Sequence, residues 1–127
     1  MATQVLIAED EPNIVELLTF LLERAGCRTS AVFDGAKALE QLRAAPPDVL
    51  VLDLMLPGCD GYEVLKTVRG DPRLSGLRVI MLTAKGQEKD RRLAESLGVD
   101  AFITKPFSNR DLVDCVTRLG AAGARAG

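Results

Sequence analysis

The chain has 127 residues, of which 47% are hydrophobic and 27% charged, and its formal net charge is −2. This length predicts one domain, because domains usually hold ~100–200 residues. The slightly acidic balance disfavours direct binding to nucleic acid or to an anionic membrane. No apolar run approaches the ~18 residues of a membrane span, and the acidic amino-terminal segment does not resemble a signal peptide. We therefore expect a cytoplasmic protein.

The sequence contains no histidine and three cysteines. Without histidine, a Ser-His-Asp triad, a Cys-His pair and a His-ligated metal site are all excluded. Cys27, Cys59 and Cys115 are far apart and form no CxxC pair, so neither a disulfide framework nor a zinc site is predicted. We interpret them as reduced, mostly packed thiols, and a reactive thiol at Cys59 is the alternative.

Short β-like runs alternate with helical patterns along the chain. The runs predict five strands, at residues 4–8, 28–32, 48–52, 78–82 and 101–104. After each strand, apolar residues recur with the helical period and predict a helix. The apolar faces of these five helices comprise, in chain order, Ile14, Leu17, Leu18, Leu21, Leu22 and Ala25; Ala38, Leu39 and Leu42; Val64, Leu65 and Val68; Leu93, Ala94 and Leu97; and Leu112, Val113, Val116 and Leu119.

Residues at the predicted helix ends support this division. Gly26, Gly70 and Gly98 follow three of the helices, where a left-handed residue is favoured. Ser108 with Asp111 is typical of a capping box that opens the last helix, and Asp60-Gly61 is typical of a turn and cap. We expect residues 1–119 to form the domain and residues 120–127, GAAGARAG, to form a flexible tail or the start of a linker.

Five strand–helix units predict an α/β fold with a doubly wound, five-stranded parallel sheet of the flavodoxin-like kind and right-handed crossovers. The first, third and fourth strands are the most continuously apolar, as central parallel strands are. This favours the strand order 2-1-3-4-5, with the switch point between the first and third strands. Ligands of such sheets bind at the carboxyl ends of the strands beside the switch point.

Polar side chains follow four of the five strands. Glu9-Asp10-Glu11 follows the first strand, Asp53 the third, Thr83 the fourth and Lys105-Pro106 the fifth. Each has an ordinary structural alternative: Asp10 and Thr83 could cap helices, Asp53 could be a turn or capping residue, and Lys105 could be a solvated lysine. Taken one by one, these alternatives do not explain why all of these residues are expected at the same ligand-binding edge of the sheet.

Clustered carboxylates repel each other unless a cation joins them. Their oxygens are hard ligands that suit Mg²⁺, which also keeps waters and binds phosphate oxygens. A lysine would add a second positive charge and a threonine a hydroxyl donor. Such a set around one open position is typical of a phosphoryl-transfer site, in which an aspartate can be the nucleophile.

Four segments resemble the receiver domain of bacterial two-component response regulators, and the resemblance covers residues 3–119. The segments are IAEDEP (7–12), VLDLMLPGCDG (51–61), MLTAKG (81–86) and AFITKPF (101–107). The resemblance implies that Asp53 is the phosphorylation site and that Lys105, which contacts a phosphoryl oxygen, and Thr83 complete the catalytic set. Ala84 and Pro106 would line the phosphoryl site, with Pro106 after a cis peptide bond.

The resemblance also implies a metal set and a switch. Asp10, Asp53 and the main-chain carbonyl of Met55 would bind Mg²⁺, and Glu9 would hold a metal-bound water. Glu9 stands where this family more often has aspartate, so its carboxylate lies one methylene further out. On activation, Thr83 would move toward the phosphoryl group and Phe102, which stands where tyrosine is common, would rotate inward.

The implied function is a phosphorylation-activated signalling switch and not an enzyme, apart from its own phosphotransfer and autodephosphorylation. Because the chain has no histidine, a histidine kinase or histidine phosphotransfer protein must act in trans, with docking expected around the first helix and the loop after the fifth strand. An output protein, an output domain or a second copy would bind the fourth helix, fifth strand and fifth helix. We expect no direct contact of this domain with nucleic acid or membrane.

Three other functions share parts of this pattern. A haloacid-dehalogenase-type phosphatase needs a second aspartate two residues after its nucleophile, where this chain has Met55. A flavin carrier of the same fold needs a Ser/Thr/Gly-rich phosphate loop after the first strand, where the acidic EDEPN would repel a phosphate. A pseudo-receiver, which binds partners without phosphorylation, would be distinguished by a test with a small phosphodonor.

Overall fold

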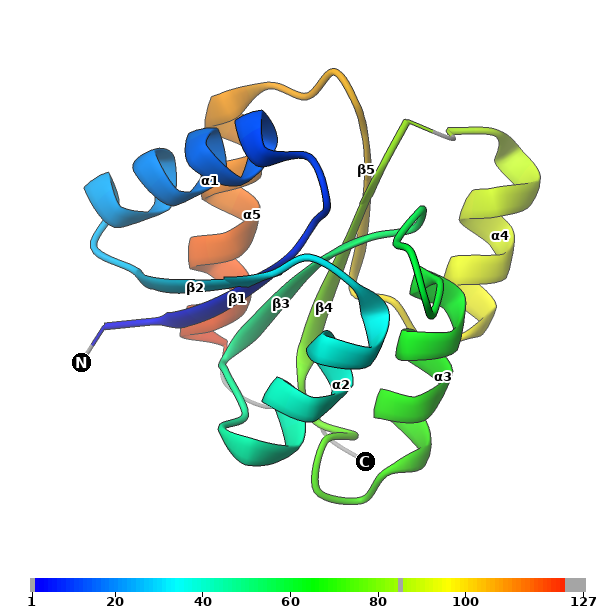
Figure 1. The fold of residues 1–127 in the computed structure, drawn as a ribbon. Helices are drawn as coiled ribbons and strands as arrows, with labels where there is room; N and C mark the ends of the chain where they lie inside the picture. Colours follow the sequence, from blue (N-terminus) through cyan, green and yellow to red (C-terminus); the bar gives the residue numbers. More distant parts are fainter. Residues whose placement is uncertain (1, 85, 123–127) are drawn as a thin grey trace.

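The computed structural model describes residues 2–84 and 86–122 as five strands alternating with five helices (Figure 1). The strands are β1 (Gln4–Ala8), β2 (Arg28–Val32), β3 (Val49–Asp53), β4 (Arg78–Thr83) and β5 (Ala101–Thr104). The helices are α1 (Pro12–Arg24), α2 (Gly35–Ala44), α3 (Gly61–Gly70), α4 (Glu88–Ser96) and α5 (Asn109–Ala121). The predicted strands agree to within one residue, but β3 and β4 each extend to include the polar residue at their carboxyl end, Asp53 and Thr83.

The strands form one parallel sheet in the order β2-β1-β3-β4-β5, as predicted. Val51 of the central strand β3 pairs with Ile7 of β1 and Ile80 of β4, so the most apolar strands lie in the middle. Because the strands are parallel, their carboxyl ends share one edge of the sheet. That edge gathers the residues that follow β1, β3, β4 and β5.

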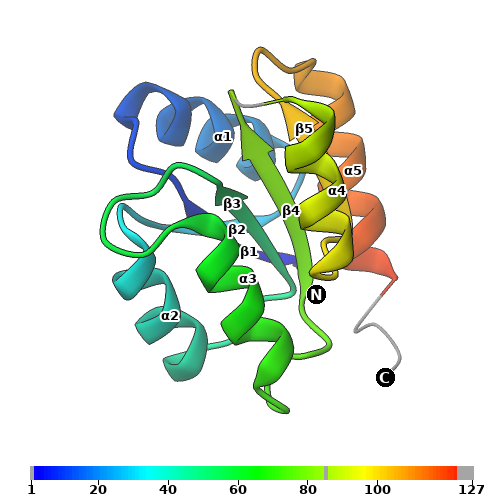
Figure 2. The ribbon, with the colours of Figure 1, turned by 90° about the vertical axis from the view of Figure 1, so that its right-hand side faces the viewer.

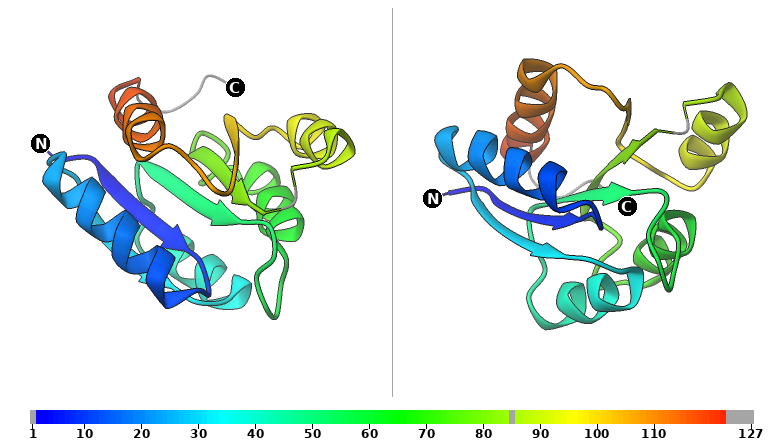
Figure 3. Two further views of the ribbon diagram at one scale, coloured as in Figure 1. Left: turned by 90° about the horizontal axis from the view of Figure 1, so that it is seen from above. Right: turned by 45° about the horizontal axis from the view of Figure 1, so that its top comes forward.

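Helices cover both faces of the sheet, and successive strand residues point to opposite faces. Helices α1 and α5 pack on one face, where Ile7, Val51 and Leu82 point, and α2, α3 and α4 pack on the other, where Leu6 and Leu50 point. Figures 1 and 3 show the two layers, and Figure 2 shows α3 and α4 on the near side of the sheet. The doubly wound α/β prediction is confirmed.

Two predicted helix ends are correct and one is wrong. Gly26 and Gly98 have φ values of 93° and 92° after α1 and α4. Gly70 instead is the last residue of α3, and among the described residues the third glycine with positive φ is Gly58, at 81°, in the turn after β3. The Ser108 hydroxyl caps α5 by accepting the Asp111 N–H at 3.2 Å, as predicted.

Helix α5 extends through Ala121, so residues 120 and 121, which the sequence assigned to the tail, are helical. The backbone of a helix can continue through glycine and alanine when its preceding turns pack well, and Leu112 and Val116 of α5 are fully buried. Residues 123–127 of the predicted tail lie outside the described residues.

Three members of the predicted apolar faces are exposed at the surface, Leu17, Leu93 and Ala25. Leu17 of α1 and Leu93 of α4 expose 38% and 44% of their surface, whereas Leu18 and Ala94 beside them are fully buried. A helix lying on a flat sheet buries only a narrow stripe, so the outer members of a broad apolar face remain in solvent.

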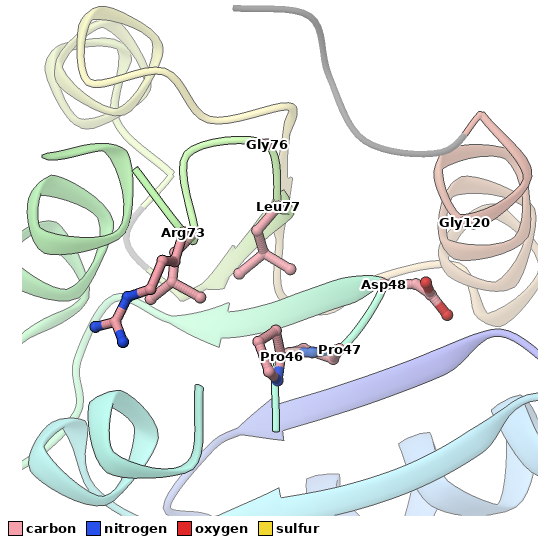
Figure 4. A pocket seen from close by; sticks show the side chains of 8 residues that line it. Pro46, Pro47, Asp48, Arg73, Gly76, Leu77 and Gly120 are labelled. Carbon is pink, nitrogen blue, oxygen red and sulfur yellow. The ribbon is translucent and has the colours of Figure 1, made fainter. Parts of the chain in front are cut away.

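A hollow of about 180 Å³ lies at the amino-terminal edge of the sheet, opposite the gathered polar residues (Figure 4). Its lining combines the loop before β3, the loop before β4 and the end of α5. Asp48 and Arg73 are the charged residues in this lining.

Among the described residues, no helix has the length and apolar character needed to cross a membrane.

Candidate phosphoryl-acceptor and metal site

Three carboxylates meet at the carboxyl edge of the sheet, beside the switch point between β1 and β3. Glu9 and Asp10 follow β1, and Asp53 ends β3. One oxygen from each lies within 4.8 Å of the others, which is close enough for a shared cation. Glu9 and Asp53 are buried, with 1% and 4% of their surface exposed, and Asp10 is exposed. The predicted cluster is therefore present, with one member open to solvent.

Lys105 brings a positive charge into this cluster from the loop after β5. Its Nζ lies 2.7 Å from Glu9 Oε1 and 3.2 Å from Asp53 Oδ2. The Lys105 N–H donates to the Thr83 carbonyl at 2.8 Å, which fixes this loop against the end of β4. The Lys105-Pro106 peptide bond is cis, as predicted. Lys105 is thus an ion-pair partner and not the solvated lysine of the alternative interpretation.

The remaining oxygens of the two buried carboxylates accept backbone hydrogen bonds. Glu9 Oε2 accepts the Glu11 N–H at 3.1 Å, and Asp53 Oδ1 accepts the Met55 N–H at 2.9 Å. Asp53 therefore forms the predicted turn as well as the ion pair. A carboxylate held by two different donors keeps one orientation, and the turn brings Met55 beside the cluster.

The two capping alternatives are wrong. Helix α1 begins after Glu11 and α4 begins after Gln87, and neither helix start has a side-chain cap. Asp10 and Thr83 therefore do not serve as the caps of these helices. The structure does confirm the cap at Asp60, whose Oδ1 accepts the Glu63 N–H at 3.0 Å and opens α3.

Burial and neighbouring charge change the acidity of this cluster. Burial contributes most to raising the pKa of Glu9, and Asp53 adds to it, so that the pKa reaches about 7 despite the lowering contribution of Lys105. For Lys105, burial lowers the pKa, but Glu9 and Asp53 outweigh it and raise the pKa above the ordinary value. Lys105 therefore stays charged, while Glu9 is poised to lose its proton near neutral pH.

The switch and lining residues come from β4, β5 and the loops that follow these strands. Thr83 is fully buried at the end of β4, and Ala84 and Pro106 are exposed. Phe102 of β5 exposes only 8% of its surface, so its ring occupies an inward position in this structure. The inward rotation on activation that the resemblance implied stays a prediction, because the structure shows one position of the ring.

Close packing of the loop after β3 supports the acceptor strand. A Cβ on Gly61 would lie 2.8 Å from the Asp53 carbonyl oxygen and 2.8 Å from Leu54 Cα, so only glycine fits at the start of α3.

Cys59 packs against the core. Burial contributes most to raising the pKa of its thiol, and the negative charges of Asp60 and Glu63 raise it further. A raised pKa favours the packing interpretation of Cys59 over a reactive thiol.

Sequence reasoning missed the residues that attach α4 next to the site. The Tyr62 hydroxyl donates to Asp90, with Asp90 O and Oδ1 both at 3.3 Å. The Arg91 guanidinium lies over the Phe102 ring, with Cζ 4.9 Å from its centroid. The available sequence signal was that Tyr62 is the single tyrosine, but the pairing of residues 28 positions apart has no local pattern.

The site combines a fixed, buried carboxylate with an ammonium group and two more carboxylates at the open end of a parallel sheet. Oxygen donors without nitrogen or sulfur match the preference of Mg²⁺. The positive charge of a lysine beside the acceptor can stabilise the negative charge of a transferred phosphoryl group. The arrangement can therefore hold a hard cation and a phosphoryl group side by side.

Comparisons with known proteins agree with this chemistry. The model of the response regulator receiver domain matches residues 5–117. The response regulator GtcR of Aneurinibacillus migulanus is 38% identical over 126 residues, which are 99% of this chain and 50% of that protein. The chain spans about half the length of the curated relatives that it matches.

Solved structures show the same likeness. The receiver domain of a signal transduction histidine kinase from Syntrophus aciditrophicus has a TM-score of 0.90 and 34% identity, covering 99% of this chain and 96% of that one. The receiver domain of the sensor histidine kinase PA1611 of Pseudomonas aeruginosa PAO1, with a magnesium ion coordinated in its active-site cleft, has a TM-score of 0.87 and 26% identity, covering 95% and 99%. This chain therefore belongs to the receiver-domain family of two-component response regulators.

Proposed function

We propose that this chain is a phosphorylation-activated switch in which Asp53 accepts a phosphoryl group from a histidine kinase or a histidine phosphotransfer protein. The observation that carries the proposal is the position of Asp53, which is buried at the switch point with Lys105 Nζ 3.2 Å from its Oδ2. Receiver domains act with histidine kinases and output domains, so the family supports this direction of transfer. The Asp53 side chain is the acceptor.

Mg²⁺ is the proposed cofactor, because the donor set consists of oxygen atoms from three carboxylates within 4.8 Å. Asp10, Asp53 and the carbonyl of Met55 would hold the ion, and Glu9 would hold one of its waters. The receiver domain of PA1611 has a magnesium ion coordinated in its active-site cleft, and the response regulator Rcp1 was solved in a Mn²⁺-bound form. When bound, the cation supplies positive charge that offsets the repulsion between the acceptor and the incoming phosphoryl oxygens.

The chain's own residues carry the transfer. An Asp53 carboxylate oxygen forms a bond to phosphorus as the bond to the donor's imidazole nitrogen breaks, and an acyl phosphate results. Lys105 Nζ then exchanges its contact with Asp53 for a phosphoryl oxygen. The Thr83 hydroxyl donates to another phosphoryl oxygen, and the small Ala84 leaves room for the group. Beyond this transfer and its own dephosphorylation, the domain acts as a regulator and not as an enzyme.

The proposed donor docks on a groove beside the site. The groove encloses about 460 Å³ between α1 and the loop after β5, and it borders the phosphoryl site at Ala84 and Lys105. Its apolar part comes from Ile14, Leu17 and Phe107. An apolar groove that opens onto the acceptor would hold a helix that presents a phosphohistidine.

The output surface is proposed on α4, β5 and α5, with Phe102 linking it to Thr83.

Phosphorylation of Asp53 is tested by intact mass after incubation with acetyl phosphate and Mg²⁺. The parent chain should gain one phosphoryl group, and Asp53→Asn should gain none, because the amide is not a nucleophile here. Asp60→Asn is the matched control, since an asparagine can still cap α3, and it should label like the parent. Labelling of Asp53→Asn at the parental rate would refute the assignment, and an unlabelled parent would indicate a binding module that works without phosphorylation.

A further inference from the structure

Phe102 is held from two sides. One side of its ring packs into the core cluster beneath α2, α3 and α4, and its exposed fraction is 8%. On another side the Arg91 guanidinium of α4 covers the ring, with Cζ 4.9 Å from the centroid. A guanidinium stacks well on an aromatic face, and its aliphatic stem shields apolar surface. Phenylalanine has no hydroxyl that could form a hydrogen bond, so its ring interacts with a charged group through its face.

Helix α4 depends on few buried side chains. Ala94 is the only residue of α4 that is fully buried, and Leu93 exposes 44% of its surface. Figures 1 and 2 show α4 at the periphery, beside β4 and β5. Side-chain contacts at the start of the helix therefore add to the attachment that Ala94 provides.

Two successive residues of α4 make those contacts. Asp90 accepts a hydrogen bond from Tyr62 of α3, and Arg91 covers Phe102 of β5. The next residue, Arg92, is different: its side chain is 77% exposed and it pairs with Glu88 within the same helix. Among the ion pairs recorded for the described residues, none involves Arg91. Its guanidinium is therefore committed to the ring.

We infer that Arg91 is a positioning residue that keeps the Phe102 ring buried and joins α4 to β5. The inference rests on the proposed function for its consequence, because the ring matters as part of the switch at Thr83. A cation over an aromatic face at a partly exposed site corresponds to a roughly 2- to 5-fold preference for the covered position. Arg91 thus sets how often the ring is inside, and phosphorylation acts on that equilibrium.

The contact is tested first in the unmodified full chain. The probe is the relaxation of the Phe102 ring protons by a soluble nitroxide, with the signals assigned by Phe102→Leu. Arg91→Ala should raise the exposed population roughly 2- to 5-fold, and Arg91→Lys should fall between this variant and the parent. Arg92→Ala, the matched control from the same helix, should leave the relaxation unchanged. Equal relaxation in Arg91→Ala and the parent would overturn the inference.

A second measurement separates positioning from simple stability and from the proposed function. Melting temperatures of Arg91→Ala and Arg92→Ala should be similar, so a difference between them in ring exposure has a local origin. After acetyl phosphate treatment, both variants should gain phosphate on Asp53, and the ring of Arg91→Ala should become more buried than before. If no chain gains phosphate, the proposed function fails, while the ring exposure of the unmodified variants still decides the role of Arg91. Phosphate gain with no change in the ring of Arg91→Ala would contradict the inference.

Discussion

At the scale of single residues, Glu9 and Asp10 are adjacent but have different environments. Both Glu9 oxygens already have partners, with Lys105 Nζ at 2.7 Å and the Glu11 N–H at 3.1 Å. Asp10 is exposed and contributes an oxygen to the same cluster. A carboxylate that is free to turn toward a cation can coordinate it directly, whereas one held by the protein acts more readily through water.

Mg²⁺ binding should therefore depend more on Asp10 than on Glu9. Removing a direct ligand costs more affinity than removing a residue that acts through water, although the latter loss can still be ~10–100-fold. Titration of Mg²⁺ against Asp10→Asn and Glu9→Gln measures both losses under the same conditions. Asp48→Asn, which changes a carboxylate at the opposite, amino-terminal edge of the sheet, serves as the control for net charge. Equal losses, or a larger loss in Glu9→Gln, would reverse the ranking.

Lys105 should contribute to stability without Mg²⁺ and to phosphotransfer with it. Lys105→Ala leaves Glu9 and Asp53 buried without their cation, so the free energy of unfolding should fall by about 1–3 kcal/mol in the absence of Mg²⁺. Mg²⁺ should recover this loss and bind at least as tightly, because a competing cation is gone.

The rate of phosphorylation by acetyl phosphate should nevertheless fall roughly 10²-fold in Lys105→Ala, since a charge on the transferred group is lost. Denaturation with and without Mg²⁺ and the labelling rate are measured on the same variant. Lys66→Ala, whose exposed ammonium pairs with Glu63 in α3, is a suitable control. A large loss of stability with an unchanged rate would make Lys105 a structural counter-ion only.

At the scale of elements, Arg69 joins three connections at the amino-terminal edge of the sheet. Its guanidinium donates to the carbonyls of Leu77 at 2.6 Å and Gly98 at 2.9 Å and pairs with Asp100 at 2.9 Å. Asp100 also accepts the Val79 N–H at 2.7 Å and pairs with Arg78. The end of α3, the start of β4 and the turn before β5 are thereby fixed together.

Arg69→Met should lower the free energy of unfolding by about 3–5 kcal/mol, because it keeps the stem but removes the buried guanidinium that pairs with Asp100 and donates to the carbonyls of Leu77 and Gly98. Arg73→Met is the matched control: the Arg73 side chain is 72% exposed and pairs with Asp71, so its loss should cost at most about 1 kcal/mol. Urea denaturation of both variants gives the comparison. Similar midpoints for the two would show that the Arg69 network adds nothing beyond a surface ion pair.

At the scale of the whole molecule, the two edges of the sheet have different tasks. The amino-terminal edge carries the Arg69 network, where the buried charges are paired within the protein. The carboxyl edge gathers three carboxylates around one lysine, and there the pKa of Glu9 is raised to about 7. We therefore expect ionisation of the buried Glu9 to cost stability at the edge where phosphoryl transfer is proposed, as is common for functional sites.

The pH dependence of the free energy of unfolding should reveal the raised pKa of Glu9. Glu9 binds its proton more tightly in the folded chain than in the unfolded one, so without Mg²⁺ its contribution to the free energy of unfolding is complete below pH 4.5 and is lost as pH rises through about 7. Relative to Glu9→Gln, the parent should lose about 1–3 kcal/mol between pH 5 and 8. Urea denaturation at the two pH values measures it. Parallel profiles for the two chains would show that Glu9 ionises normally.

Much of this protein follows from its sequence. Apolar periodicity determined the five strand–helix units, because the period of burial is a local property of strands and helices. The parallel order and the rule that ligands bind at the carboxyl ends of strands then placed Glu9, Asp10, Asp53, Thr83 and Lys105 at one edge. The four motifs added the roles of these residues by resemblance.

The tertiary structure decided what depends on distance between separate segments. Lys105 contacts Glu9 more closely than Asp53, Arg69 pairs with Asp100, and Arg91 covers Phe102. None of these pairs has a sequence pattern, because each joins elements whose separation is set by how helices settle on the sheet. The same holds for burial at helix surfaces: periodicity marks an apolar face, but the width of the stripe that the sheet covers determines which of its members are buried.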